Sequence, residues 1–98
     1  MSGGWPVVAE AEAVMGRVRF PGPAEAAAAL VRALRGVEMG PQQRAYAEGC
    51  LIGAGAAEYL ERRLDRAGEW TLTVHLLDRS GTRPRWVGRE LRISLVAR

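Results

Sequence analysis

The chain contains one cysteine, Cys50, and one histidine, His75, so any thiol–imidazole chemistry has to use this pair. A catalytic thiol needs a base within hydrogen-bond reach, and its pKa falls only in electropositive, partly exposed surroundings. Cys50 instead lies on the apolar stripe of a predicted helix, and His75 alternates to the outward face of a predicted strand. The pattern favours Cys50 as a small buried hydrophobe and predicts that the two residues do not meet.

Other candidate chemistry is equally thin. Glu58, Glu61 and Asp65 share one helix surface, but arginines are interleaved with them, which is typical of paired surface charges. Residues 53–55 (Gly-Ala-Gly) do not follow a strand, and no lysine is available to reach a phosphate, so a phosphate-binding loop is excluded. One cysteine and one histidine cannot complete a tetrahedral metal site. We therefore expect no enzymatic activity, no cofactor and no metal.

One cluster could bind an anion. Near the C-terminus, arginines surround a tryptophan: Arg79, Arg83, Arg85, Trp86 and Arg89. Guanidinium groups grip phosphates in a bidentate way, and an aromatic ring can stack on a base, so nucleic acid or another polyanion is one interpretation. The competing interpretation, which we favour, is a solvated hairpin tip whose charges discourage pairing with other strands.

The predicted order of two helices followed by a hairpin is loosely similar in shape to a winged helix. In that arrangement Gln42, Gln43 and Arg44 begin the recognition helix, where base edges are contacted. A recognition helix exposes a polar face, however, whereas residues 45–57 contain a single charged residue, Glu48. The similarity is one of shape and does not indicate a family.

The composition predicts one small domain with a thin core. Of the 98 residues, 48% are hydrophobic, but 16 are alanines and only 22 are Val, Leu, Ile or Phe. A chain of this size buries only about two thirds of its unfolded surface, so an alanine-rich interior leaves little margin of stability. We expect a single domain over residues 1–98, with residues 1–4 disordered, that gains contact area from a second chain.

Charge and cysteine usage predict a cytoplasmic protein. All 14 basic residues are arginines, which is typical of a bacterial source with a GC-rich genome. The N-terminus lacks a secretory pattern, and a single cysteine cannot form an intrachain disulfide. The uncharged stretches are far shorter than the roughly 20 residues of a spanning helix, so we expect no contact with a membrane.

Proline and glycine residues mark the ends of the predicted helices. One helix begins near Pro23 and ends at Arg35, before Gly36, and a second begins at Pro41 and ends before Gly68. The second contains a ridge of small residues at four-residue spacing, Gly49, Gly53 and Ala57, and its glycines either permit close packing or mark a break at residues 53–55. We favour an unbroken helix whose ridge packs against the alanines of helix 24–35.

After Gly68 the hydrophobic period changes from helical to alternating. Residues 70–76 and 91–95 therefore predict a β-hairpin, with a bulge at Gly88. The N-terminal segment shows both periods, and we favour a strand at residues 14–20. The predicted fold is α+β, a two-layer sandwich of order β-α-α-β-β with a small antiparallel sheet on two helices. The alternative, with a helical N-terminus, is α-α-α-β-β.

These patterns favour a small non-enzymatic protein-binding or assembly domain that acts as a homodimer or as a subunit of a complex. The expected interface residues are Leu51 and Ile52 on the uncharged helix segment and Leu77 and Val96 on the sheet. The alternative function is nucleic-acid binding through the arginine-rich hairpin.

Overall fold

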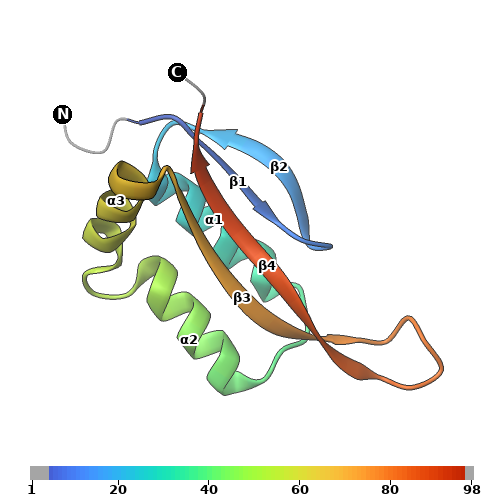
Figure 1. Cartoon of the computed structure of the whole chain (residues 1–98). Coiled ribbons are helices and arrows are strands. Elements are labelled where there is room, and N and C mark those ends of the chain that lie inside the picture. Colours follow the sequence, from blue (N-terminus) through green and yellow to red (C-terminus); the bar gives the residue numbers. More distant parts are fainter. Residues whose placement is uncertain (1–4, 97–98) are drawn as a thin grey trace.

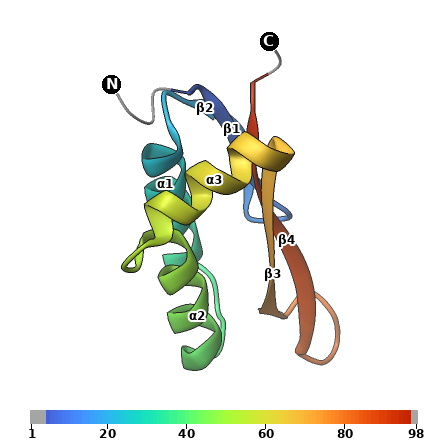
Figure 2. The same cartoon turned by 60° about the vertical axis from the view of Figure 1, so that its left-hand side comes forward.

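The computed structural model describes residues 5–96 and shows an α+β sandwich of two layers (Figures 1 and 2). Three helices cover one face of a four-stranded antiparallel sheet with strand order β2-β1-β4-β3. The elements are β1 (Val7–Ala11), β2 (Met15–Phe20), α1 (Pro23–Arg35), α2 (Pro41–Ile52), α3 (Ala56–Ala67), β3 (Glu69–Asp78) and β4 (Arg85–Leu95). The predicted fold class is confirmed, with one strand and one helix more than expected.

The N-terminal segment forms a hairpin, which confirms a strand near residues 14–20 and shows that a helical N-terminus is wrong. β1 lies between β2 and β4, so both of its edges are hydrogen-bonded. Val7, Ala9 and Ala11 point into the core and are fully buried. The alternating period therefore decides the structure here, because this strand occupies the interior of the sheet.

The prediction of one unbroken helix from Pro41 to Gly68 is wrong, because the chain turns sharply between α2 and α3. A Cβ on Gly53 would lie 2.5 Å from the carbonyl oxygen of Gly49, so only glycine permits this approach. Gly55 has a φ of 79°, in the left-handed region that glycine adopts without strain. The ridge does not pack against α1 either, since Gly49 is exposed and a Cβ there would touch nothing within 4 Å.

The core lies between α1, α3 and the inner face of the sheet. Its large, fully buried side chains are aliphatic: Leu30, Leu34, Leu60, Leu64, Leu91, Ile93, Val7 and Val74. Burying one such side chain contributes roughly 1.5–3 kcal/mol relative to leaving it exposed. Because all of them belong to one continuous cluster, a single copy of the chain already contains a closed core.

The β3–β4 hairpin is regular and longer than the helical layer. Its register runs without a shift from Glu69 opposite Ser94 to Asp78 opposite Arg85, so the predicted bulge at Gly88 is wrong. The end of this two-stranded ribbon extends beyond the helices (Figure 1) and gives the molecule an elongated shape of 49 × 27 × 20 Å.

The left-handed backbone conformation in the β1–β2 turn can be tested by mutation. Ala13 has a φ of 63°, a left-handed conformation that costs a residue with a Cβ roughly 1–2 kcal/mol. Glycine removes this strain but adds entropy to the unfolded chain, so Ala13→Gly should raise the free energy of unfolding in urea by up to about 1 kcal/mol. Ala28→Gly, inside α1, should instead lower it by about 1 kcal/mol. A loss of stability in Ala13→Gly would contradict the turn geometry.

Candidate protein-binding surface

The outer face of α2 differs from those of the other two helices. None of the exposed residues of α2, which the structure describes in full, is charged: Pro41, Gln42, Ala45, Tyr46, Gly49 and Ile52. Tyr46 and Ile52 are 57% and 52% exposed. The exposed faces of α1 and α3 carry several arginines and carboxylates, as solvated helices normally do.

This uncharged surface continues across the turn into α3. A depression of about 350 Å³ lies between the α2–α3 turn and β3, and we call it the elbow groove. Its lining includes Tyr46, Cys50, Tyr59, Trp70, Thr71 and Leu72. Tyr59 is 52% exposed, whereas Trp70 is almost fully buried. The elbow groove therefore combines apolar surface with tyrosine and threonine hydroxyl groups.

Cys50 lies in the elbow groove rather than deep in the core. It is half-buried and close to Tyr46, one helical turn away. The Cys50 thiol raises the pKa of Tyr46, mainly by repulsion between the two anionic forms and also by a hydrogen bond, and the Tyr59 hydroxyl adds a smaller repulsion. His75 lies on the outer face of β3, opposite Gly88, and does not line this groove. The structure thus places the two residues apart, as the alternation predicts.

The free edge of β3 is covered over only half its length. The Leu77 N–H donates to the Glu38 carbonyl at 3.0 Å, and the His75 N–H donates to Gln43 Oε1 at 2.8 Å. Since hydrogen-bonding directions alternate along a strand, the N–H groups of Thr71 and Thr73, like those of His75 and Leu77, point outward from the sheet edge. Neither has a hydrogen-bond partner among residues 5–96. The open half of the edge therefore runs beside the elbow groove.

The residues proposed for a recognition helix are engaged within the fold. The Arg44 guanidinium donates to the carbonyls of Leu34 and Val37 at 2.9 and 2.7 Å, where it caps the C-terminal end of α1. Gln43 accepts the hydrogen bond from β3. Of the three, Gln42 is exposed, whereas Gln43 and Arg44 are half-buried. The start of α2 therefore holds the fold together and offers little to a ligand.

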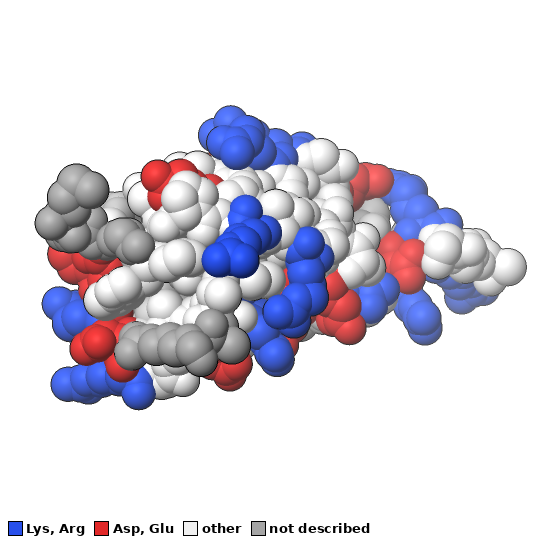
Figure 3. Space-filling view, turned by 90° about the horizontal axis from the view of Figure 1, so that it is seen from above, with Lys and Arg blue, Asp and Glu red and all other residues white. Residues whose placement is uncertain are grey.

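The arginine cluster of the hairpin is partly neutralised. The Arg79 guanidinium forms a bidentate ion pair with Glu38, with distances of 2.6 and 3.0 Å. Asp78 lies directly opposite Arg85, and its pKa is lowered, first by hydrogen bonds from Ser80 and then by nearby arginines. Figure 3 shows acidic side chains among the basic ones toward the projecting end.

The remaining members of the cluster are more accessible. Arg83, Arg85 and Trp86 are exposed, with 58% of the Trp86 surface open, whereas Arg89 is half-buried. The structure brings these residues onto one ribbon but spreads them over both of its faces, because Trp86 alternates with Arg85 along β4.

The expected interface residues separate into three environments. Leu51 lies in the core and is only 2% exposed, so of the two residues only Ile52 lies on the outer surface of α2. Leu77 and Val96 are half-buried, and their N–H groups bond to Glu38 and Pro6. The sequence did not single out Tyr46 or Tyr59 as surface residues, because the apolar stripe through Cys50 in one unbroken helix also contains Tyr46, one turn earlier. The turn at Gly53 ends α2 there and separates the faces of the two helices.

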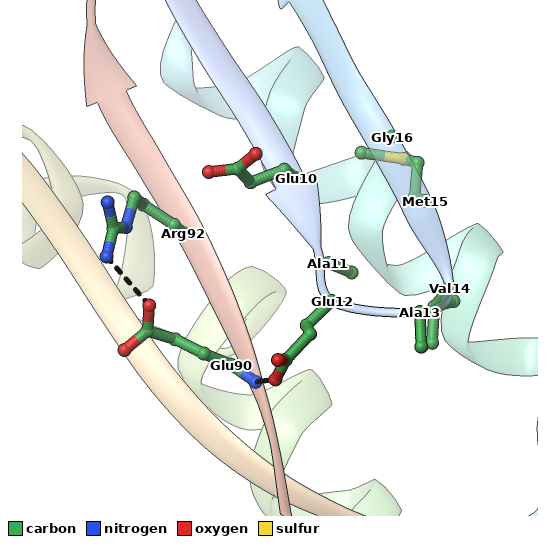
Figure 4. A pocket seen from close by; sticks show the side chains of 9 residues that line it. All are labelled: Glu10, Ala11, Glu12, Ala13, Val14, Met15, Gly16, Glu90 and Arg92. Atoms are coloured by element: carbon green, nitrogen blue, oxygen red, sulfur yellow. Dashed lines mark hydrogen bonds and ion pairs between the residues drawn. The ribbon is translucent and has the colours of Figure 1, made fainter.

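A second hollow, of about 780 Å³, lies over the outer face of the sheet next to the β1–β2 turn (Figure 4). Some of its polar groups bind one another: Arg92 pairs with the Glu90 carboxylate at 2.8 Å, and the Glu90 N–H donates to Glu12 at 3.3 Å, whereas the buried Nε of Arg92 has no hydrogen-bond partner in the described part of the chain. Within residues 5–96, no group of three or more His, Cys, Asp or Glu could hold a metal ion. We find no catalytic arrangement in this hollow.

The Glu38–Arg79 pair predicts a pH dependence. The ion pair lowers the pKa of Glu38 below its ordinary 4.5, so its stabilising effect is complete above that pH and is lost as the pH falls through the lowered value. Wild type should therefore exceed Glu38→Gln in urea resistance at about pH 7, and the difference should vanish well below pH 4.5. Glu61→Gln, in the middle of α3 and outside the ion pairs of the described residues, serves as the control. An equal difference at both pH values would contradict the role of the pair.

Comparisons with known proteins do not assign this surface. No protein-family model matches the chain, and neither the curated proteins nor the solved structures contain a match. No helix in the described residues has the length and apolar character to cross a membrane.

Proposed function

We propose that this chain is a small non-enzymatic protein-binding or assembly domain that acts as a homodimer or as a subunit of a larger complex. The uncharged outer face of α2, extended by the elbow groove, carries this proposal. Tyrosines are enriched at protein interfaces, and charged residues are depleted at interface centres. Covering this surface with a partner removes Ile52 and two tyrosines from water, and removing apolar surface from water favours association.

A second candidate function is nucleic-acid binding through the hairpin. The observation that favours it is the projection of the ribbon beyond the helices, with Arg83, Arg85 and Trp86 exposed near its end. A two-stranded ribbon of this kind fits the major groove of DNA. The ion pair of Arg79 with Glu38 and the position of Asp78 opposite Arg85 reduce the net positive charge, so we rank this function second.

The protein-binding function predicts that a charge at Ile52 blocks association. Ile52→Arg should weaken self-association, measured by light scattering, or retention of a co-purified partner, by about tenfold or more, since about 1.4 kcal/mol changes affinity tenfold. Ala24→Arg adds the same charge on the exposed face of α1 and should bind like wild type. A wild-type chain that is monomeric, melts sharply and retains no partner would contradict the proposal.

The two candidate functions respond differently to loss of the hairpin arginines. In a variant with Arg83, Arg85 and Arg89 replaced by alanine, association with protein should be unchanged, because the uncharged α2 surface is intact. Fluorescence anisotropy with a labelled duplex and a labelled single strand tests the second candidate. Binding that falls steeply with salt and disappears in this variant would favour nucleic acid over our leading proposal.

A further inference from the structure

Basic side chains border the elbow groove on α3. Tyr59 lines both this groove and a neighbouring depression of about 230 Å³, whose other lining residues are Arg62, Arg63 and Arg66. All three arginines are exposed, and none forms an ion pair within the described part of the chain. The surface pairing that the sequence predicts for α3 is therefore not formed.

The charges of α3 are segregated around the helix. Tyr59 and the three arginines follow one another at three- and four-residue spacings, which places them on one flank. Glu58, Glu61 and Asp65 share a second flank by the same rule. The flank that meets the elbow groove is the basic one, because Tyr59 belongs to it.

We propose that the elbow groove binds an extended, acidic peptide segment of a partner protein, which adds a fifth strand along the open edge of β3 at Thr71–Thr73. This inference rests on the protein-binding function proposed above and names the chemistry of its partner. It combines three features that lie together on one side of the molecule: unpaired edge amides, an uncharged groove and an arginine-bearing flank.

The open edge supplies the main-chain contacts. An added strand lies about 4.8 Å from its neighbour and bonds to every second residue of it, here Thr71 and Thr73. Alternate side chains of such a strand point to the same side, so an apolar one enters the groove between Tyr46 and Tyr59. Farther along β3, Gln43 and Glu38 already occupy the edge and limit the added strand to a short segment.

The basic flank selects the charge of the segment. Carboxylates at the end of the peptide nearest α3 reach Arg62, Arg63 and Arg66, and guanidinium–carboxylate contacts are among the stronger hydrogen bonds. Glu69, the carboxylate at the start of the same edge, precedes the buried Trp70, so it points to the outer sheet face and does not line the groove. A single peptide fits better than the β3 edge of a second copy, because α2 lies beside this edge in each copy (Figure 1).

The experiment titrates the full-length chain with a capped peptide of roughly six residues, the length of a common strand, in which valine alternates with threonine and an aspartate stands at each end. Backbone amides are followed by NMR and hydrogen exchange. We expect exchange of the Thr71 and Thr73 amides to slow by about tenfold or more. The amides of His75 and Leu77, which are already bonded, should change little. A matched peptide with lysine in place of aspartate should not bind.

Two variants separate the contributions of edge and charge. Thr71→Pro removes the outward N–H without touching the ladder to β4, and it should abolish binding, whereas Thr71→Val should retain it. The double variant Arg63→Glu/Arg66→Glu, at exposed positions, should weaken binding of the acidic peptide by about tenfold or more and admit the lysine peptide. This double variant keeps the proposal testable where the proline variant fails to fold.

Three results would overturn the proposal: equal binding of both peptides, binding without protection of Thr71 and Thr73, or a single-stranded oligonucleotide that binds the arginines in place of either peptide. If the acidic peptide does not bind but Ile52→Arg still blocks association, this inference is wrong and the protein-binding function stands. If the peptide does not bind and Ile52→Arg does not change association, the proposed protein-binding function is wrong as well.

Discussion

The close approach of Gly53 to the carbonyl oxygen of Gly49 is the constraint on which the candidate surface depends. It ends α2, and the left-handed conformation of Gly55 then starts α3 in a new direction. Without this turn, one rigid helix of about 40 Å would run from Pro41 to Ala67 and leave no groove. The turn instead places Tyr46 and Tyr59 on facing sides of a depression beside β3. Glycines that look costly as helix interior residues are therefore explained as the residues of a hinge between two helices.

The sequence and the structure give different reasons for proposing a protein partner. The composition suggests a core too thin to be stable alone, whereas the structure closes one continuous aliphatic cluster within a single copy. The alanines of α1 do not leave this cluster hollow, since Ala26 and Ala27 are buried beside Leu30 and Leu34. The proposed partner therefore rests on the surface instead, because none of the exposed residues of α2 is charged, whereas those of α1 and α3 include several arginines and carboxylates.

The sequence predicts the elements that one local signal determines. Pro23 and Gly36 bound α1, and strict alternation marks β3 and β4. Prediction from the sequence fails where two local signals compete. Residues 7–13 carry both periods, and pairing on two edges decides for a strand. The candidate surface is harder still, because the exposure of Tyr46 depends on where the helix turns, and the open half of the β3 edge depends on contacts with residues far away in the sequence, such as Gln43.

The two edges of the sheet are protected to different degrees. Along β2, the backbone groups of Arg19 face outward, and the long charged side chains of Arg17 and Arg19 are exposed, which is a common defence against pairing with other strands. On β3, a carbonyl and an amide side chain cover residues 75 and 77. Among the edge residues that the structure describes, Thr71 and Thr73 combine open amides with small, uncharged side chains. Since β-branched threonine favours strand pairing, the least protected stretch of edge is also the one best suited to accept a strand, and it lies beside the groove that can hold one.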